Sequence, residues 1–236
     1  MQAHDADLPV VVDVAELATL LLTEQTFETS LRRVSVLAVD TIPSCDAAGV
    51  TLVDEGAPSS ETVSDEFTLQ VDTYQYEANE GPCLDAVRTG QVHRSASMAD
   101  EDRWPKFSPR AADAGVLSAL SVPLRVKDDN VGALNLYSRT NAFDPRDEEI
   151  AQGFARQASV VLINARAYAK ARELIDQLNE ALESRDVIGQ AKGIVMEREA
   201  CGPDRAFEIL RSTSQRRNLK LRDVATQIVG TVKASS

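Results

Sequence analysis

Cysteine and histidine are scarce in this chain. Its 236 residues include three cysteines, Cys45, Cys83 and Cys201, and two histidines. The cysteines lie far apart and show neither the C-x-x-C nor the Cys/His spacing that holds zinc or an iron–sulfur cluster. We therefore expect structural thiols and neither a metal nor a haem cofactor.

Long apolar runs and catalytic motifs are missing as well. No stretch approaches the about 18 uncharged apolar residues that a membrane helix needs. The beginning of the sequence, MQAHDADLPVVVDVAELATLLL, lacks the basic start of a signal peptide. There is no glycine-rich phosphate loop, no H-E-x-x-H and no G-x-S-x-G. These absences predict a cytoplasmic protein that contacts no membrane and is not an enzyme.

Charge is present in quantity but is unevenly distributed. The net charge is −12: residues 1–165 carry 12 Lys and Arg against 27 Asp and Glu, a balance of −15, and residues 166–236 carry 13 against 10, a balance of +3. Such an asymmetry indicates two parts with separate roles. The segment ILRSTSQRRNLKLR, residues 209–222, holds five basic residues and no acidic one.

Helix and strand signals alternate in the first part of the chain. The helical pattern is expected over residues 13–22, 27–41 and 81–90. The strand pattern is expected over residues 47–55, 67–78, 116–126 and 131–138. The last two strands flank a hairpin turn that we place at Asp128–Asn130. Helices packed on antiparallel strands predict an α+β fold.

A long helical pattern begins at Asp147 and meets no proline before Pro203. Its apolar residues recur at intervals of three and four, and one continuous helix would be about 80 Å long. A small domain does not need such a helix for its own core, so we expect residues 147–182 to form a coiled coil with a second copy. The alternative is a helix broken near Gly153 or within residues 166–172.

Two shorter helices follow, PDRAFEILRSTSQRR from Pro203 and LRDVATQIVGTV from Leu221. With the end of the long helix they predict an all-α bundle of three. The spacing of Arg185, Ile188, A191-K192-G193, Met196, Ala206, L210-R211, Ser214, Asn218 and LRDVA resembles an ANTAR domain over residues 174–232. This resemblance implies an RNA-binding module of transcription antitermination regulators, which binds paired hairpins in nascent transcripts.

The candidate RNA contacts are the basic and polar residues of this module together with two glycines. They are Arg185, Gly189, Lys192, Gly193, Arg211, Ser214, Arg216, Arg217, Asn218, Lys220 and Arg222. Lys and Arg neutralise phosphates, and loop bases are read by hydrogen bonds and stacking. Because Phe207 is the single aromatic residue of the last 60, we expect mainly polar and basic contacts.

Gly189 and Gly193 interrupt the helical pattern at a cost of about 1 kcal/mol each relative to alanine. Glycine permits a close approach of another backbone or of a ligand. A packed helix and bound RNA are both open, and the neighbouring Lys192 favours RNA.

Residues 27–165 resemble a GAF domain. The run NEGPCLDA, then RWPKF, VPLRV and GALNLYS, is similar to the form that precedes ANTAR in actinobacterial regulators, although Asn79 stands where that form commonly has glycine. The resemblance implies a sensor of a small molecule or of redox state. The predicted order is an N-terminal helical segment at 1–26, a GAF sensor domain at 27–165, the linking helix at 147–182 and an ANTAR domain at 174–236.

Three residues are candidates for the sensor pocket: Cys83, Trp104 and Phe107. Cys83 follows EGP at the start of a short helix, where the helix field would lower its pKa and favour a redox-active thiolate. A buried, inert thiol is the alternative. Trp104 and Phe107 would close the mouth of a pocket or simply pack on the sheet.

Two other functions remain open at this point. The last two helices are joined by a short turn, which also fits a DNA-binding helix-turn-helix. A GAF-type methionine sulfoxide reductase would use nucleophilic and resolving cysteines, for which Cys45 and Cys83 are the available thiols in the sensor region.

Overall fold

The computed structural model describes residues 26–54, 57–63, 65–127 and 129–233. It divides into two compact units, residues 1–169 and residues 170–236. The helix expected over residues 13–22, and all but the last residue of the segment at 1–26, lie outside the described residues.

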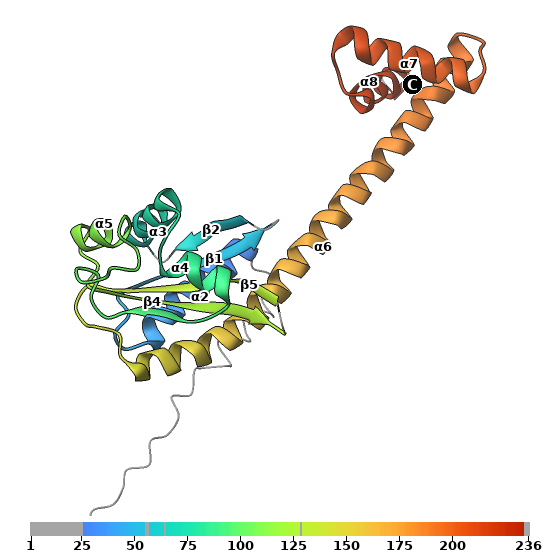
Figure 1. Cartoon of the computed structure of the whole chain (residues 1–236). Coiled ribbons are helices and arrows are strands. Elements are labelled where there is room, and N and C mark those ends of the chain that lie inside the picture. Colours follow the sequence, from blue (N-terminus) through green and yellow to red (C-terminus); the bar gives the residue numbers. More distant parts are fainter. Residues whose placement is uncertain (1–25, 55–56, 64, 128, 234–236) are drawn as a thin grey trace, which may run out of the picture. The chain divides into compact units, whose positions relative to one another are not determined.

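The N-terminal unit is built on an antiparallel sheet (Figure 1). Its strands are β1 (Ala47–Asp54), β2 (Ala57–Val63), β3 (His93–Ser95), β4 (Ser118–Val126) and β5 (Asp129–Ser138). Its helices are α2 (Phe27–Thr41), α3 (Glu66–Ala78), α4 (Pro82–Thr89) and α5 (Ser108–Asp113). The strand order is β2-β1-β5-β4-β3, which confirms the α+β fold.

The two faces of the sheet bury different side chains. Successive residues of a strand point to opposite faces, and one face packs its apolar residues against α2 and the first part of helix α6 (Pro145–Arg198). This cluster includes Leu31, Val34, Val50, Leu134, Leu136, Phe154 and Val161. The other face packs against α3 and the segment around α5, where Val71, Trp104 and Phe107 are buried.

The strand expected over residues 67–78 is wrong, because this segment forms α3. Its buried residues, Thr68, Val71, Asp72 and Gln75, recur at helical intervals and not at every second position. Asp65 caps the helix by accepting a hydrogen bond from the Thr68 amide (2.8 Å). The alternating aromatic and β-branched residues were misleading, and the polar residues before them form β2.

The β4–β5 hairpin is confirmed, but its turn lies one residue earlier than expected. Val126 already pairs with Asp129, and Asn130 with Arg125, so these two of the three predicted turn residues belong to β5. Lys127 provides a positive φ of 56° at the turn.

Helix α6 is continuous and passes through Gly153 and residues 166–172 without a break. Its end forms a three-helix bundle with α7 (Pro203–Arg217) and α8 (Leu221–Lys233), as expected. The core of this C-terminal unit consists of Ala191, Val195, Ala206, Leu210, Val224 and Ala225. Within the described part of the chain, no helix is long and apolar enough to cross a membrane.

Candidate functional site

Four polar side chains share the sheet face that lies below α3 and α4. They are Thr51 on β1, Ser121 on β4, and Asn135 and Tyr137 on β5. The register pairs Asn135 with both Gly49 and Ser121, and Tyr137 with Ala119, so the alternation of the strands aims all four side chains to one face. All four are fully buried.

Helix α3 adds Asp72 and Gln75, one turn apart and also fully buried. The Tyr137 hydroxyl donates to Asp72 Oδ1 (2.5 Å), and Asn135 Nδ2 donates to the same oxygen (3.3 Å). Gln75 Nε2 donates to the Tyr137 hydroxyl oxygen (2.8 Å). Burial and the neighbouring Asp72 charge raise the pKa of Tyr137 well above its ordinary value, so the phenol stays a donor.

The EGPC motif places Cys83 against this set of polar residues. Gly81 has a φ of 138°, and a Cβ there would lie 2.3 Å from Gln75 Oε1, so both conformation and space require glycine. The turn directs the Cys83 amide to Gln75 Oε1 (2.8 Å). Asn79 ends α3 with a φ of 54°, which explains why asparagine can replace the glycine common at this position.

The Cys83 thiol does not have the electrostatics of a reactive cysteine. Its Sγ donates to Thr51 Oγ1 (3.2 Å), and burial, assisted by the Asp72 charge, raises its pKa to about 12. From its position at a helix N-terminus we expected a lowered pKa for Cys83. This expectation is wrong in direction, because the thiol is fully buried and burial disfavours the charged thiolate. Burial also raises the pKa of Cys45 to about 12.

Trp104 and Phe107 are packed in the cluster that also contains Val71 and Tyr137 and are 2% and 0% exposed. The Trp104 indole donates to Asp85 Oδ2 on α4 (2.8 Å). Glu80, in the EGPC motif, accepts from the Phe107 amide (3.0 Å). The two aromatic residues thus hold their loop against α3 and α4, in keeping with the packing alternative.

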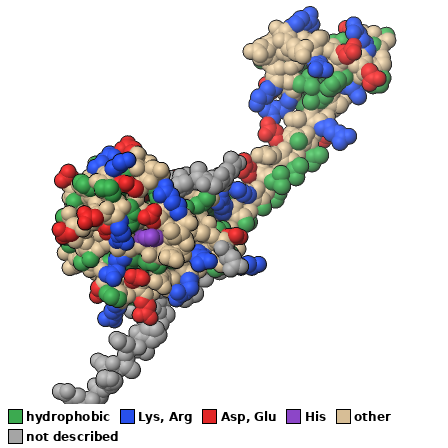
Figure 2. Space-filling view, in the orientation of Figure 1, with side chains coloured by type: hydrophobic (Ala, Val, Ile, Leu, Met, Phe, Trp, Pro, Cys, Tyr) green, Lys and Arg blue, Asp and Glu red, His purple; other side chains and the backbone are tan. Residues whose placement is uncertain are grey.

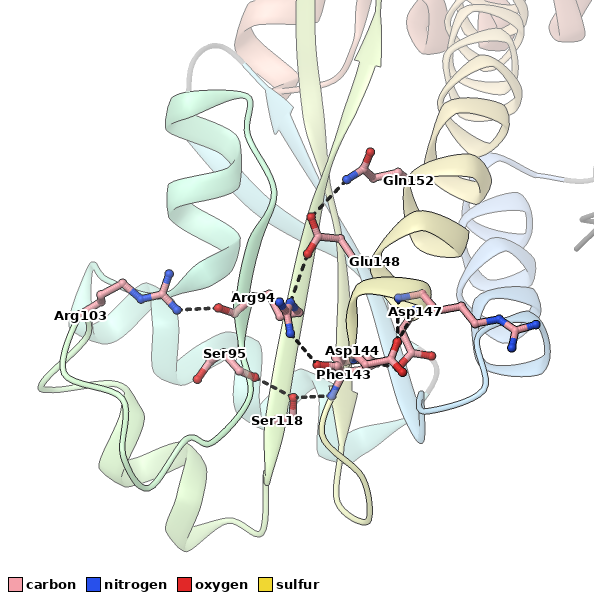
Figure 3. Close-up of polar contacts among 10 residues, drawn as sticks. Arg94, Ser95, Arg103, Ser118, Phe143, Asp144, Asp147, Glu148 and Gln152 are labelled. Carbon is pink, nitrogen blue, oxygen red and sulfur yellow. Dashed lines mark hydrogen bonds and ion pairs between the residues drawn. The ribbon is translucent and has the colours of Figure 1, made fainter. Parts of the chain in front are cut away.

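Polar contacts tie the start of α6 to strand β3 (Figure 3). Arg94 Nη1 donates to the Phe143 carbonyl (2.9 Å), and its Nε forms an ion pair with Glu148 (3.1 Å). The Ser118 hydroxyl accepts from the Phe143 amide (3.0 Å) and donates to the Ser95 carbonyl (2.7 Å). The helix that leaves the sensor unit is therefore anchored to the edge of the sheet.

The predicted RNA contacts divide into two groups. Arg185, Gly189, Lys192 and Gly193 lie on α6. Arg211, Ser214, Arg216, Arg217, Asn218, Lys220 and Arg222 lie on α7, on α8 and at their junction. Figure 2 shows Lys and Arg side chains at the surface of the C-terminal helices.

Several residues of the second group have roles within the bundle. Asn218 ends α7 with a φ of 50°, and the Ser214 hydroxyl donates to the Leu219 carbonyl (2.6 Å). Arg222 pairs with Glu180, and Arg217 donates to Gln227 (2.9 Å).

The remaining basic side chains of both groups are available to a ligand. Among the described residues, none of them has an ion-pair or side-chain hydrogen-bond partner. These residues are Arg185, Lys192, Arg211, Arg216 and Lys220.

Gly189 and Gly193 are both exposed on α6. A Cβ built at either position meets no atom of the described residues within 4 Å, so none of the helices that the structure describes packs there. The space above both glycines is open to RNA or to a second molecule.

Two surface features of the C-terminal unit complete the candidate site. Leu174, Ile175, Leu178 and Leu182 on α6 are 56% to 59% exposed, and the last three are spaced at intervals of three and four. Figure 2 shows hydrophobic side chains at the surface of this helix. Phe207 on α7 is 41% exposed and lies one turn before Arg211. A base could therefore stack on Phe207, although the scarcity of aromatic residues in the sequence argued against such a contact.

The described residues contain no cluster of His, Cys, Asp and Glu suited to a metal ion.

Comparison with protein families agrees with this arrangement. The GAF domain model matches residues 24–162, more than half of the chain, and the ANTAR domain model matches residues 176–229. The chain therefore belongs to the GAF domain family and carries a C-terminal ANTAR domain, the combination of a sensor with an RNA-binding regulatory module. No curated protein matches the chain.

Solved structures similar to the sensor unit share its fold at low identity. A GAF domain of a phosphoenolpyruvate-protein phosphotransferase from Coxiella burnetii is 16% identical, with a TM-score of 0.53 over 66% of this chain and 94% of that one. A GAF sensor protein from Burkholderia vietnamiensis is 17% identical, with a TM-score of 0.51 over 65% and 93%. A free methionine-R-sulfoxide reductase from Neisseria meningitidis, solved with its substrate, is 15% identical, with a TM-score of 0.50 over 66% and 89%.

Proposed function

We propose that this protein is a transcription antitermination regulator that binds hairpins in nascent transcripts. The observation that carries the proposal is a set of basic side chains on an ANTAR module that have no partner among the described residues: Arg185, Lys192, Arg211, Arg216 and Lys220. Such side chains neutralise RNA phosphates without first breaking an internal ion pair. A protein that binds nascent transcripts acts in the cytoplasm, and this function requires no chemical reaction.

The signal, in this proposal, is a small polar molecule bound by the GAF domain. The buried face with Asp72, Gln75, Asn135 and Tyr137 contains both donors and acceptors, which now bond to one another and which such a ligand would engage by replacing some of these hydrogen bonds. A redox signal at Cys83 is less compatible with a neutral, fully buried thiol.

The active form is a homodimer joined through α6. Four large apolar side chains, Leu174, Ile175, Leu178 and Leu182, are more than half exposed within one chain. Their spacing is that of a coiled coil, in which the same residues of a second copy cover them. A dimer presents two RNA-binding modules, as recognition of paired hairpins requires.

A methionine sulfoxide reductase is the enzymatic alternative, since the sensor unit shares its fold with such an enzyme. Cys45 belongs to the apolar cluster on the α2 face, whereas Cys83 packs with Ala133 on the opposite face. Two neutral thiols separated by the sheet do not provide a nucleophile with a resolving partner. Turnover of free methionine sulfoxide that is lost in Cys83→Ser would establish the enzyme instead.

RNA binding is tested by alanine variants of the full chain with a two-hairpin RNA leader. Lys192→Ala, and Arg216→Ala combined with Arg217→Ala, should each weaken binding. Each lost phosphate contact should reduce the slope of log affinity against log salt by about 0.7 to 0.9. Lys170→Ala, an exposed lysine earlier on α6, is the matched control. Unchanged affinity in both variants would show that RNA does not bind this surface.

A further inference from the structure

Strand β3 is much shorter than its neighbour β4, and this difference opens a gap at the edge of the sheet. On the side of β4 away from β5, the described pairing with β3 extends over His93–Ser95, opposite Ala119–Ser121, while β4 continues to Val126. The part of β4 that β3 leaves unpaired begins at Val122 and includes Pro123, which lacks an amide hydrogen and is suited to a strand edge.

A cleft of about 530 Å³ occupies this gap. It is lined by Gly90, Gln91 and Val92 before β3, by Val122, Pro123 and Arg125 of β4, and by Glu148, Gln152 and Arg156 of α6. The three α6 residues are four positions apart and therefore lie on one face of the helix. The volume falls within the range of about 300 to 1,000 Å³ that is typical of small-molecule sites.

Glu148, the acidic residue of the cleft, already has a basic partner. Glu148 pairs with Arg94 (3.1 Å) and accepts a hydrogen bond from Gln152 Nε2 (3.3 Å), so the positive charge of Arg94 offsets the repulsion between Glu148 and a bound anion (Figure 3). Arg125 lies at an irregularity of the sheet, because the pairing between β4 and β5 shifts its register between Leu124 and Arg125. Such irregularities redirect side chains at sheet edges.

The two arginines of the cleft have no such partner. Across residues 26–54, 57–63, 65–127 and 129–233, neither Arg125 nor Arg156 forms an ion pair or a side-chain hydrogen bond. They stand in a segment, residues 1–165, whose net charge is −15. Guanidinium groups hold phosphate and carboxylate groups through paired N–H donors.

We propose that this cleft binds a small anionic molecule carrying a phosphate or carboxylate group, held by Arg125 and Arg156. The site is distinct from the buried polar face below α3, because Val122 belongs to the apolar cluster on the opposite face of the sheet. The ligand bridges β4 and α6, so it acts on the helix that leaves the sensor unit. Gln91 and Gln152 supply further polar contacts.

Isothermal titration of the full chain with inorganic pyrophosphate and, separately, with succinate at constant ionic strength tests the site. The two probes distinguish a phosphate from a carboxylate ligand. Arg125→Gln and Arg156→Gln should each weaken binding of the preferred probe at least about tenfold, the loss expected for a charged hydrogen bond. Arg146→Gln, an exposed arginine on the first turn of α6 outside the cleft, should bind as the unchanged protein does.

A pair of variants with opposite charge at one position makes the test independent of arginine packing. Gln91→Lys should tighten binding and Gln91→Glu should weaken it, because the residue is exposed and lines the cleft. The proposal is overturned if neither probe binds, if both Gln91 variants shift affinity in the same direction, or if Arg146→Gln weakens binding as much as Arg156→Gln. None of these outcomes depends on RNA binding.

Discussion

The chemical reactivity of Cys83 separates a ligand sensor from a thiol switch. Its pKa of about 12 leaves about one thiol in ten thousand ionised at pH 8, against about one in ten for an ordinary cysteine with a pKa of 9.0. Because the thiolate is the nucleophile, ionisation alone should slow alkylation of Cys83 by about three orders of magnitude. Burial should slow it further.

The assay is time-resolved alkylation with iodoacetamide at pH 8, read by mass spectrometry of the separate cysteine peptides. Cys201 is partly exposed and serves as the reference within the same molecule. We expect Cys201 to react first and Cys83 to react only as the protein unfolds, with a rate that follows global unfolding in urea. A Cys83 rate within tenfold of Cys201 in the native protein would refute this reasoning and restore the redox switch.

Three further outcomes follow from the structure. Tyr137→Phe removes the hydroxyl that donates to the buried Asp72 carboxylate, and it should lower the free energy of unfolding, measured in urea, by about 2 to 4 kcal/mol. A loss below about 0.5 kcal/mol, which is the size of a neutral surface change, would contradict the importance of this contact. Burial raises the pKa of Cys45 and Cys83 from 9.0 to about 12, so the full stabilisation from these neutral thiols is present below pH 9. Between pH 9 and 12 the free energy of unfolding should fall by up to about 1.4 kcal/mol per pH unit for each thiol. Urea titrations across this range should show a shallower decline in alanine variants of either cysteine. Leu178→Glu places a charge in the proposed dimer contact and should convert a dimer to a monomer in sedimentation equilibrium, whereas a variant that stays dimeric would argue for another interface.

The regular elements were largely predictable because local signals agreed with tertiary structure. Pro82 and Gly90 mark the ends of α4, and Gly202 with Pro203 marks the start of α7. The segment 67–78 was not predictable from alternation, since its β-branched and aromatic residues fit both periods. The Asp65 cap before it and the spacing of Asp72 and Gln75 were the signals that favoured a helix.

The buried polar face was missed for the same reason. Asp72 and Gln75 belong to the misassigned segment, so their position over β5 could not be inferred. Asn135 lies between Leu134 and Leu136 in GALNLYS, and a polar residue inside an apolar strand was the available signal. Its partners depend on strand register, which the sequence alone does not reveal.

The pKa of Cys83 shows where local reasoning fails. Its place at the start of a helix was predicted correctly, and the helix field there does favour a thiolate. The structure adds complete burial and a nearby carboxylate, and desolvation outweighs the field. Similarly, the sequence predicts Arg222 as an RNA contact, whereas in the structure Arg222 pairs with Glu180, which lies 42 positions away in the sequence.

Binding to RNA against DNA tests the central claim most directly. The affinity of the full chain for a two-hairpin RNA leader and for duplex DNA of equal length should be measured over a salt series. We expect tighter binding to the RNA at every salt concentration, with a loss of affinity in Lys192→Ala. Equal or tighter binding to duplex DNA would contradict the account and favour a helix-turn-helix regulator.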